Sequence, residues 1–406
     1  MEKASNDSAG SANARADERR ALGAAATAHV VHDGYSDLLY VLLPVWQAEF
    51  GLGYAEVGLL RSSYTAAMAS LQIPSSLLAE RISPVLVLVA GTVLAAACFL
   101  LAGASAGLTG LLCALVLGGI GASTQHPIGS AIVSAAFQGA RSRTALGVYN
   151  FTGDLGKIVL PALAATLLTF MAWRPALWVL GGVGLAAAFV VLVLAPASAR
   201  MPTRSTAADA PPATAAPIAP APTGFRLLLS IGMIDNAARS GFLTFLPFLL
   251  QAKGASLAIV GLALSLTFAG GAAGKLVCGY LGARLGVLVT VALTESLTAA
   301  GILALLALPL DAALLLLPVI GIGLNGTSSV LYGTVPELVA PEARTRAFGI
   351  FYTGAIGASA AAPPLFGFFS DAFGVPDTMT AIAIGVLATI PLTLLLNPLL
   401  PRSQTA

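Results

Sequence analysis

The sequence predicts an all-α polytopic membrane protein with about twelve transmembrane helices in two six-helix bundles, on three observations: composition, apolar segments and an internal repeat. Hydrophobic residues make up 57% of the 406 residues and charged residues only 9%, whereas soluble domains carry roughly 25% charged residues. A chain this apolar cannot cover its own surface with polar groups in water. The net charge of +2 gives no indication of a nucleic acid partner.

Apolar segments of the length that crosses a bilayer, roughly twenty residues, recur along the whole chain. We expect spans at 26–49, 55–79, 84–106, 108–137, 143–170, 175–197, 224–251, 256–282, 285–308, 311–339, 344–371 and 377–400. Residues 1–20 are polar and predict a disordered tail without a cleavable signal peptide. The Pro- and Ala-rich segment 198–223 predicts a linker. The bundles are therefore expected at 21–197 and 224–400, followed by a tail at 401–406.

The two predicted bundles repeat one another. Six residues of the first half have the same residue type 203 positions later: Pro44, Gly51, Val57, Gly58, Leu78 and Arg81, matched by Pro247, Gly254, Val260, Gly261, Leu281 and Arg284. Chance matches among apolar residues are common in such a chain, but Pro, Gly and Arg pairs in one register are not. Six spans followed by a parallel repeat of six is the organisation of many secondary transporters.

The distribution of basic residues predicts the orientation, because short cytoplasmic loops are enriched in Lys and Arg. With the amino terminus inside, the outside loops contain only Arg174 and Lys253. The inside segments contain Arg19, Arg20, Arg81, Arg141, Arg143, Arg200, Arg204, Arg226, Arg284, Arg344, Arg346 and Arg402. Both termini and the linker are therefore expected in the cytoplasm, with the chain in a bacterial inner membrane.

Two turns resemble the signature of the major facilitator superfamily, Gly-x-Leu-x-Asp-Arg-x-Gly. The turn after the second span contains Leu78, Glu80 and Arg81, and the turn after the eighth contains Leu281 and Arg284 with Ala283 in place of the acid. The resemblance implies the major facilitator fold and a cytoplasmic gate at Glu80, Arg81 and Arg284. A generic basic loop is the alternative interpretation.

The fifth predicted span resembles the small-residue motif of drug/proton antiporters within that superfamily. Gly147 and Gly156 keep the motif's spacing, Pro161 follows, and Leu160, Ala164 and Ala165 replace three of its glycines. Small residues there allow close helix packing, which is also the simpler explanation. The family that the first half most resembles is that of the fosmidomycin resistance exporters, through His29-x-x-His32-Asp33, Glu49-Phe50-Gly51-Leu52 and His126-Pro127-x-Gly129-Ser130. Asp154 and Lys157 depart from that family's fifth span.

Ionisable residues within predicted spans are the candidate functional residues, because charges at bilayer depth are costly and usually face a cavity or a partner. His29, Asp33 and Asp37 are spaced by four residues and form one helical stripe, with His32 beside it. Two carboxylates one turn apart repel each other if both are ionised, so one of them is expected to hold a proton. We therefore predict proton coupling by Asp33 and Asp37, assisted by His29 or His32.

Other polar residues in the spans predict a substrate site. The candidates are Arg61, His126, Asn150, Asp154, Lys157, Asp235, Arg239 and Lys275. With one residue of slippage, Asp33 aligns with Asp235 and Asp37 with Arg239. Four of these residues are basic and suggest an anionic group on the substrate. Structural interpretations remain open for several of these residues. Asp154 with Lys157 and Asp235 with Arg239 can be neutralised pairs within a helix, Arg61 can extend to the outer membrane interface, His126 can serve helix packing and Lys275 can be a structural ion-pair partner. Glu295 is expected to be structural.

The function these observations predict is secondary active transport, with two bundles rocking around a site near the membrane midplane. Proton-coupled export of a small organic molecule or drug is the first hypothesis, and uptake of an organic anion with protons is the second. A non-transporting receptor is the alternative of a different class. No cofactor or metal site is expected: Cys98, Cys113 and Cys278 lack metal-ligand spacing, and no catalytic set of an enzyme is recognisable. The expected partners are substrate, protons and lipid, with the protein a monomer.

Overall fold

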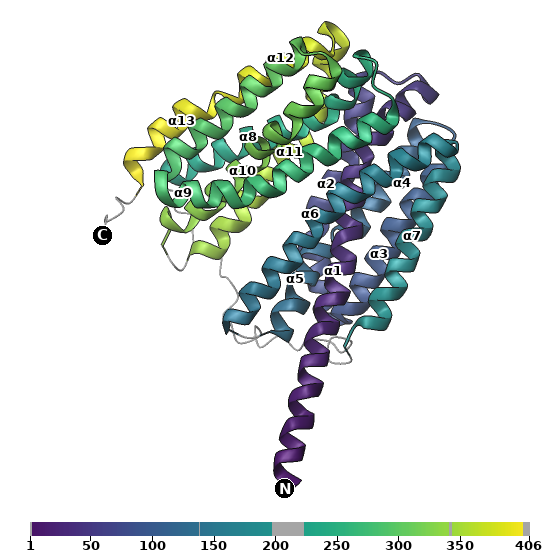
Figure 1. Ribbon diagram of the computed structural model, residues 1–406, viewed down its shortest axis with the longest axis vertical. Helices are drawn as coiled ribbons and strands as arrows, with labels where there is room; N and C mark the ends of the chain where they lie inside the picture. The colour runs from purple at the N-terminus through teal and green to yellow at the C-terminus, as the bar shows by residue number, and fades with distance from the viewer. Residues whose placement is uncertain (1, 138, 197–222, 341–342, 401–406) are drawn as a thin grey trace. The chain divides into compact units, whose positions relative to one another are not determined.

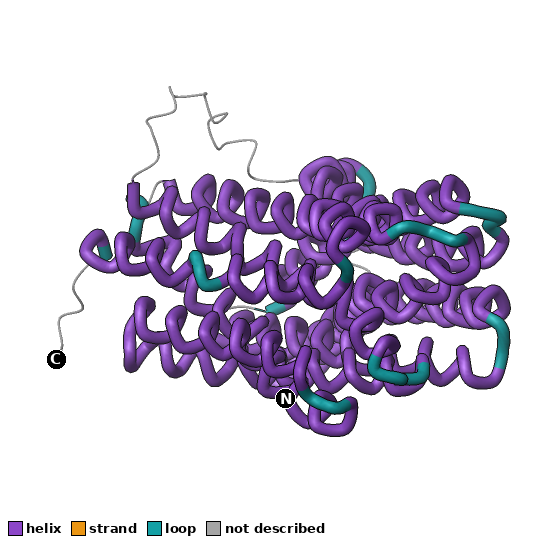
Figure 2. Tube along the Cα trace, turned by 90° about the horizontal axis from the view of Figure 1, so that it is seen from above, coloured by secondary structure: helices purple, strands orange, loops and turns teal. Residues whose placement is uncertain are grey.

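A computed structural model describes residues 2–137, 139–196, 223–340 and 343–400 of the protein (Figure 1). Within these residues the chain forms helices joined by short loops, and Figure 2 shows no strand among them. The predicted all-α class is therefore confirmed. The predicted linker and carboxy-terminal tail lie outside the described residues, apart from Thr223, where α8 begins.

The helices follow the predicted spans closely. Those of the first half are α1 (Glu2–Phe50), α2 (Tyr54–Arg81), α3 (Pro84–Ala104), α4 (Leu108–Ala122), α5 (Gln125–Ala136), α6 (Gly139–Phe170) and α7 (Trp173–Leu194). Those of the second half are α8 (Thr223–Ala252), α9 (Leu257–Ala307), α10 (Leu310–Thr334), η3 (Val335–Glu337), α11 (Arg344–Phe373), α12 (Val375–Val386), α13 (Thr389–Leu396) and η5 (Asn397–Leu399).

Seven of these helical segments are long and apolar enough to cross a membrane, judged within the described residues. The long helices α1, α2, α8 and α11 are not among them. Their lower hydropathy comes in part from charged residues that are buried inside the protein, such as Asp33 on α1 and Asp235 on α8. Helices that present charges to protein rather than to lipid are less apolar than spans that lipid surrounds.

The first helix is longer than predicted. α1 begins at Glu2, so residues 2–20 continue the first span as a helix instead of forming a disordered tail. Alanine and long charged residues favour helix once a stable span has nucleated it. Glu18 in this extension also forms an ion pair with Arg141 near the start of α6, which ties the extension to the bundle.

Two predicted span boundaries have specific causes. The fourth span breaks into α4 and α5 at Ser123 and Thr124, four and three residues before Pro127, because a proline ring clashes with the carbonyl four residues earlier and donates no hydrogen bond. The eighth and ninth spans are joined as α9, but Gly286 within it has φ 79° and ψ 171°. Only glycine adopts this conformation readily, so the two spans meet at Gly286.

The described chain forms two compact units. The first comprises Met1–Leu38, Ala67–Leu160 and Phe170–Pro212, and the second comprises Leu39–Ala66, Pro161–Thr169 and Ala213–Ala406. The carboxy-terminal end of α1, the amino-terminal half of α2 and the end of α6 thus pack with the second half of the sequence.

Contacts between α2 and α11 within the second unit show how this packing is made. The Asp371 carboxylate accepts hydrogen bonds from the backbone N–H groups of Tyr54 at 2.7 Å and Ala55 at 3.0 Å, at the start of α2. A Cβ atom on Gly58 would lie 2.3 Å from the Pro363 carbonyl oxygen, so only glycine allows the two backbones to approach this closely. An acid at a helix amino terminus satisfies free N–H groups and interacts favourably with the helix dipole.

Candidate functional site

The predicted stripe on α1 contributes the centre of a buried charged cluster in the first unit. Asp33 is only 7% exposed, and His29, one turn before it, is also buried. Asp37, one turn after Asp33, is buried as well. Burial removes these groups from water, so each charge among them needs a partner in the protein.

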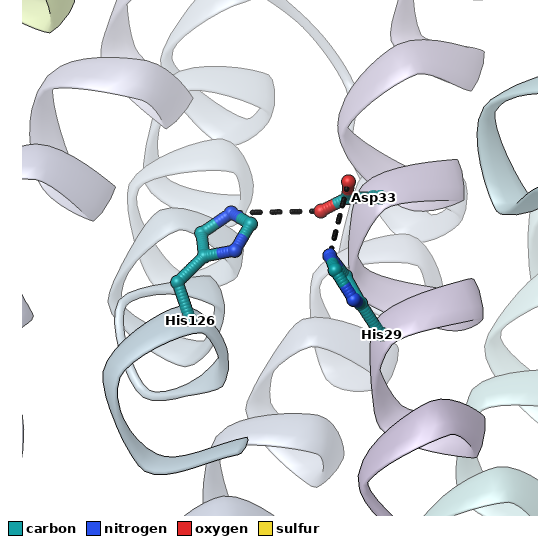
Figure 3. Close-up of side chains that lie close together, drawn as sticks. All are labelled: His29, Asp33 and His126. Atoms are coloured by element: carbon teal, nitrogen blue, oxygen red, sulfur yellow. Dashed lines mark ion pairs between the residues drawn. The ribbon is translucent and has the colours of Figure 1, made fainter. Parts of the chain in front are cut away.

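Three basic side chains surround Asp33. Its Oδ2 lies 3.3 Å from His29 Nε2 and 3.2 Å from Lys157 Nζ, and its Oδ1 lies 3.5 Å from His126 Nε2. Figure 3 shows the two imidazole rings approaching the carboxylate from different helices, α1 and α5. Lys157 comes from α6 and also lies 3.8 Å from Asp154 Oδ1. The cluster therefore joins α1, α5 and α6 through one carboxylate.

The contacts of His29 restrict where the protons of its ring can lie. His29 Nδ1 lies 2.8 Å from the backbone oxygen of Tyr149, which only accepts, so Nδ1 carries a proton. A neutral imidazole with its proton there has a lone pair at Nε2, which would face the lone pairs of Asp33. The contact is favourable only when one more proton lies on His29 Nε2 or on Asp33. A proton on either group turns the His29–Asp33 contact into a hydrogen bond.

The surroundings of His29 fix its orientation. Its ring packs on the Tyr149 ring, with centroids 4.3 Å apart, and the Tyr149 hydroxyl accepts a 2.7 Å hydrogen bond from Gln125 Nε2. Gly153 on α6 leaves the space that the cluster occupies. A Cβ atom there would lie 2.4 Å from His29 Nε2 and 2.7 Å from Asp33 Oδ2.

Close packing of α1 on α6 brings Lys157 to Asp33. A Cβ atom on Gly156 would lie 2.1 Å from the Val30 carbonyl oxygen, and one on Gly34 would lie 2.5 Å from Leu160. Gly156 and Leu160 belong to the predicted antiporter-like pattern of the fifth span. In this structure the pattern therefore serves helix packing, and through it the position of Lys157.

His32 lies outside this cluster. Its Nε2 is 3.0 Å from the Thr92 hydroxyl on α3, and that hydroxyl donates to the Leu88 carbonyl oxygen. Since the hydroxyl proton is used, His32 Nε2 is the donor to Thr92. His32 thus connects α1 to α3. The prediction that His32 assists Asp33 in proton coupling stays a prediction, because the hydrogen bond of His32 goes to Thr92.

The other candidates of the first half lie at separate places. Arg61 donates to Thr65 at 2.6 Å, and its guanidinium stacks on the Tyr40 ring 4.6 Å from the centroid, both within the second unit. Asn150 is exposed, while Asp154 is half-buried beside Lys157. Lys157 and His126 are both half-buried, so each remains partly accessible.

The candidates of the second half gather on α8 and its neighbours. Arg239 donates to the side-chain oxygens of Asn236 on α8 and Asn325 on α10. Asp235, one turn before Arg239, is 2% exposed and contacts Glu295 on α9. Lys275 is half-buried on α9. The predicted gate residues Glu80, Arg81 and Arg284 are exposed, with Arg284 stacked on Tyr280.

A divalent metal is a second chemical interpretation of the cluster. His29, Asp33 and His126 each offer one ligand atom, and these atoms lie within 4.8 Å of one another. The Lys157 ammonium group, however, lies 3.2 Å from the same carboxylate and would repel a metal ion bound there. The geometry therefore favours a proton over a metal at Asp33.

Several residues of the site were not predicted. Tyr149 and Gln125 hold His29, and Gly153 makes room for it, yet uncharged residues in apolar spans give no distinct signal in a sequence. Glu295 was expected to be structural because the ninth span is peripheral in the fold that the resemblance implied. It contacts Asp235 because α9 packs against α8.

Comparison with known proteins places the chain among membrane transporters. The model of the Major Facilitator Superfamily matches residues 25–233 and 228–405. The "Fosmidomycin resistance protein" of Escherichia coli (strain K12) is 28% identical over 179 residues, which cover 43% of this chain and 42% of that protein. The matched region thus spans less than half of the length of this curated relative.

Solved structures of transporters share the fold. A bacterial homolog of the human lysosomal transporter Spinster, in an inward-facing and occupied conformation, has a TM-score of 0.76 at 15% identity and covers 93% of this chain and 96% of its own. A mutant of a peptide transporter has a TM-score of 0.75 at 13% identity and covers 94% of this chain and 95% of its own. A mutant nucleoside transporter has a TM-score of 0.73 at 14% identity, with 94% and 99% covered. At these identities the likeness concerns the fold alone.

Proposed function

Because the chain belongs to the Major Facilitator Superfamily, we propose that it is a proton-coupled antiporter that exports a small organic molecule or drug across the bacterial inner membrane by alternating access. The observation that carries the proton coupling is the contact between His29 and Asp33. With His29 Nδ1 donating to the Tyr149 carbonyl oxygen, this pair needs one further proton for a favourable contact.

Protonation of Asp33 would change the ion pairs of the cluster. When Asp33 is ionised, it pairs with Lys157 at 3.2 Å and with the two histidines. When a proton neutralises Asp33, Lys157 and His126 lose that partner. Binding of one proton therefore alters the interactions among α1, α5 and α6, which is the kind of change that biases a two-state transporter.

Antiport requires that the proton and the substrate compete for the same group. An exported molecule that offers a cation or a hydrogen-bond donor to ionised Asp33 meets this requirement. Export is also favoured by the similarity to the Escherichia coli fosmidomycin resistance protein. Fosmidomycin is accordingly the first compound to test, followed by a library of small organic molecules.

Proton-coupled uptake of an organic anion is the second candidate, and the Lys157–Asp33 ion pair favours it. Protonation of Asp33 removes the charge of one of the two carboxylates beside Lys157, which favours binding of an anionic group there together with the proton. Proton uptake when the identified substrate binds to purified protein in weakly buffered detergent would establish symport. Proton release would establish antiport.

The decisive experiment measures substrate flux in proteoliposomes with and without an imposed pH difference. Asp33→Asn is expected to abolish transport driven by the pH difference while leaving exchange of substrate for substrate, which moves no net proton. Asp37→Asn tests the second acid of the stripe. The exposed Asp17→Asn on the same helix is the matched control and is expected to transport normally. Full driven accumulation in both the Asp33→Asn and Asp37→Asn proteins would remove this stripe from the mechanism.

A further inference from the structure

The second unit contains a pair of buried acids that the proposed mechanism does not use. Asp235 on α8 is 2% exposed, and Glu295 in the later part of α9 is 1% exposed. The two carboxyl groups lie within side-chain hydrogen-bonding reach of each other. Glu295 Oε1 is itself buried without a hydrogen-bond partner among the described residues. Two acids in direct contact at this depth need a specific chemical explanation.

Two carboxyl groups this close to each other need a proton between them. Two ionised carboxylates have only lone pairs and repel one another, so a hydrogen bond between them exists only when one of them carries a proton. One proton shared by the pair leaves a single negative charge, which a single neighbouring cation can balance.

The groups around the pair fit this charge. Arg239, one turn after Asp235 on α8, is the nearby cation, and it donates to Asn236 and Asn325. Thr327 on α10 lies beside Glu295, and its hydroxyl donates to Thr294 at 2.7 Å. The remaining titratable groups that interact with the pair are neutral phenols, Tyr332 on α10 directly and Tyr352 on α11 through Tyr332. Arg239 thus balances one carboxylate, and no second cation faces Glu295 among these described neighbours.

The internal repeat places this pair at an equivalent position to a contact in the first unit. Asp235 is 203 residues after His32, and Glu295 is 203 residues after Thr92. His32 and Thr92 are themselves hydrogen-bonded at 3.0 Å. The first and third helices of each half therefore meet through a polar pair at the same point, and the second half has replaced a histidine and a threonine by two acids. This register also pairs Asp33 with Asn236, instead of the one-residue slippage inferred from the sequence.

We propose that Asp235 and Glu295 form a second proton-binding site, in which Glu295 carries the proton and donates a hydrogen bond to the Asp235 carboxylate. The ligand is a proton, and the site lies in the other unit from the His29–Asp33 pair. The proton stays bound for as long as α8 and α9 remain packed around it.

The test is infrared spectroscopy of the purified protein in H₂O and D₂O. Wild type is expected to show a protonated-carboxyl C=O band, shifted by deuterium, that the Asp235→Asn/Glu295→Gln double variant lacks. The double variant keeps the shapes of both side chains and a hydrogen bond between them, so it is expected to fold. Asp17→Asn, which removes an exposed acid, is expected to leave the band unchanged.

A second measurement addresses the same proton through stability. Loss of the proton at high pH leaves two buried carboxylates that repel, so the melting temperature of wild type should fall with rising pH more steeply than that of the double variant. A protonated-carboxyl band as intense in the double variant as in wild type would overturn the proposal. So would melting temperatures that rise with sodium concentration in wild type alone, because the pair would then bind a monovalent cation.

Discussion

Individual residues determine the cluster around Asp33 through the space they leave as much as through their charge. Gly153 contributes no polar group, but it lies where any side chain would overlap both His29 and Asp33. Gly153 on α6 leaves the space in which the side chains of His29 and Asp33 meet. The arrangement of His29 and Asp33 therefore depends on a residue that has no side chain.

Gly153→Ala is expected to disrupt the cluster and to abolish proton-driven transport. The added methyl group would lie 2.4 Å from His29 Nε2, which forces the ring or the helix to move. Overpacking of this kind typically costs about 1–3 kcal/mol. The measurements are driven flux in proteoliposomes and the melting temperature in detergent. Gly147→Ala on the same helix is the matched control, because its Cβ would meet nothing within 4 Å. Equal transport by the two variants would contradict the argument.

At the scale of elements, the start of α2 depends on an acid from a helix far away in the sequence. Asp371 on α11 accepts hydrogen bonds from two backbone N–H groups at the start of α2, which no carbonyl of α2 can satisfy. Gly58 on α2 and Gly367 on α11 allow the backbones to meet there, since a Cβ on either would lie 2.3 Å from a carbonyl oxygen of the other helix. The contact holds the two elements together inside the second unit.

Asp371→Asn is expected to weaken this contact by about 1–2 kcal/mol, because it removes a charged acceptor of two backbone hydrogen bonds. The melting temperature should fall, and a cysteine introduced by Ala55→Cys should react faster with a thiol reagent in a background without native cysteines. Asp377→Asn is the control. Asp377 also lies at the start of a helix, but it belongs to that helix, α12, whereas Asp371 on α11 contacts the start of a different helix, α2. A melting temperature lowered no more by Asp371→Asn than by Asp377→Asn would mean that the α2–α11 contact contributes little.

At the scale of the whole molecule, we predict the membrane orientation from the distribution of basic residues over the loops, with both termini in the cytoplasm. Ala106 lies in the exposed loop after α3, and Ala343 lies in the exposed segment before α11. In a cysteine-free background, Ala106→Cys is expected to react with a membrane-impermeant thiol reagent on intact cells. Ala343→Cys is expected to react only after the cells are permeabilised. Labelling in the reverse order would place both termini outside and would invert the proposed direction of proton flow.

The sequence by itself determined the fold class, the positions of the helices and the family. Composition and segment length reflect the lipid solvent, which acts on every residue of a span in the same way. The helix break before Pro127 and the turn at Gly286 also have local causes, because proline and glycine change the backbone where they stand. The residues of the α1 stripe were recognisable for a similar reason, since a charge at membrane depth is conspicuous in any apolar run.

Only the tertiary structure decided which of these residues meet. Asp33 was predicted to interact with Asp37 on its own helix, whereas its described partners His126 and Lys157 come from α5 and α6. Glu295 and Asp235 lie sixty residues apart in the sequence and meet because α9 packs on α8. Helical periodicity determines which residues share a face of one helix. Which other helix that face contacts depends on packing between helices that are distant in the sequence. That packing depends on small residues such as Gly34, Gly153 and Gly156, whose effect appears only when the helices are in contact.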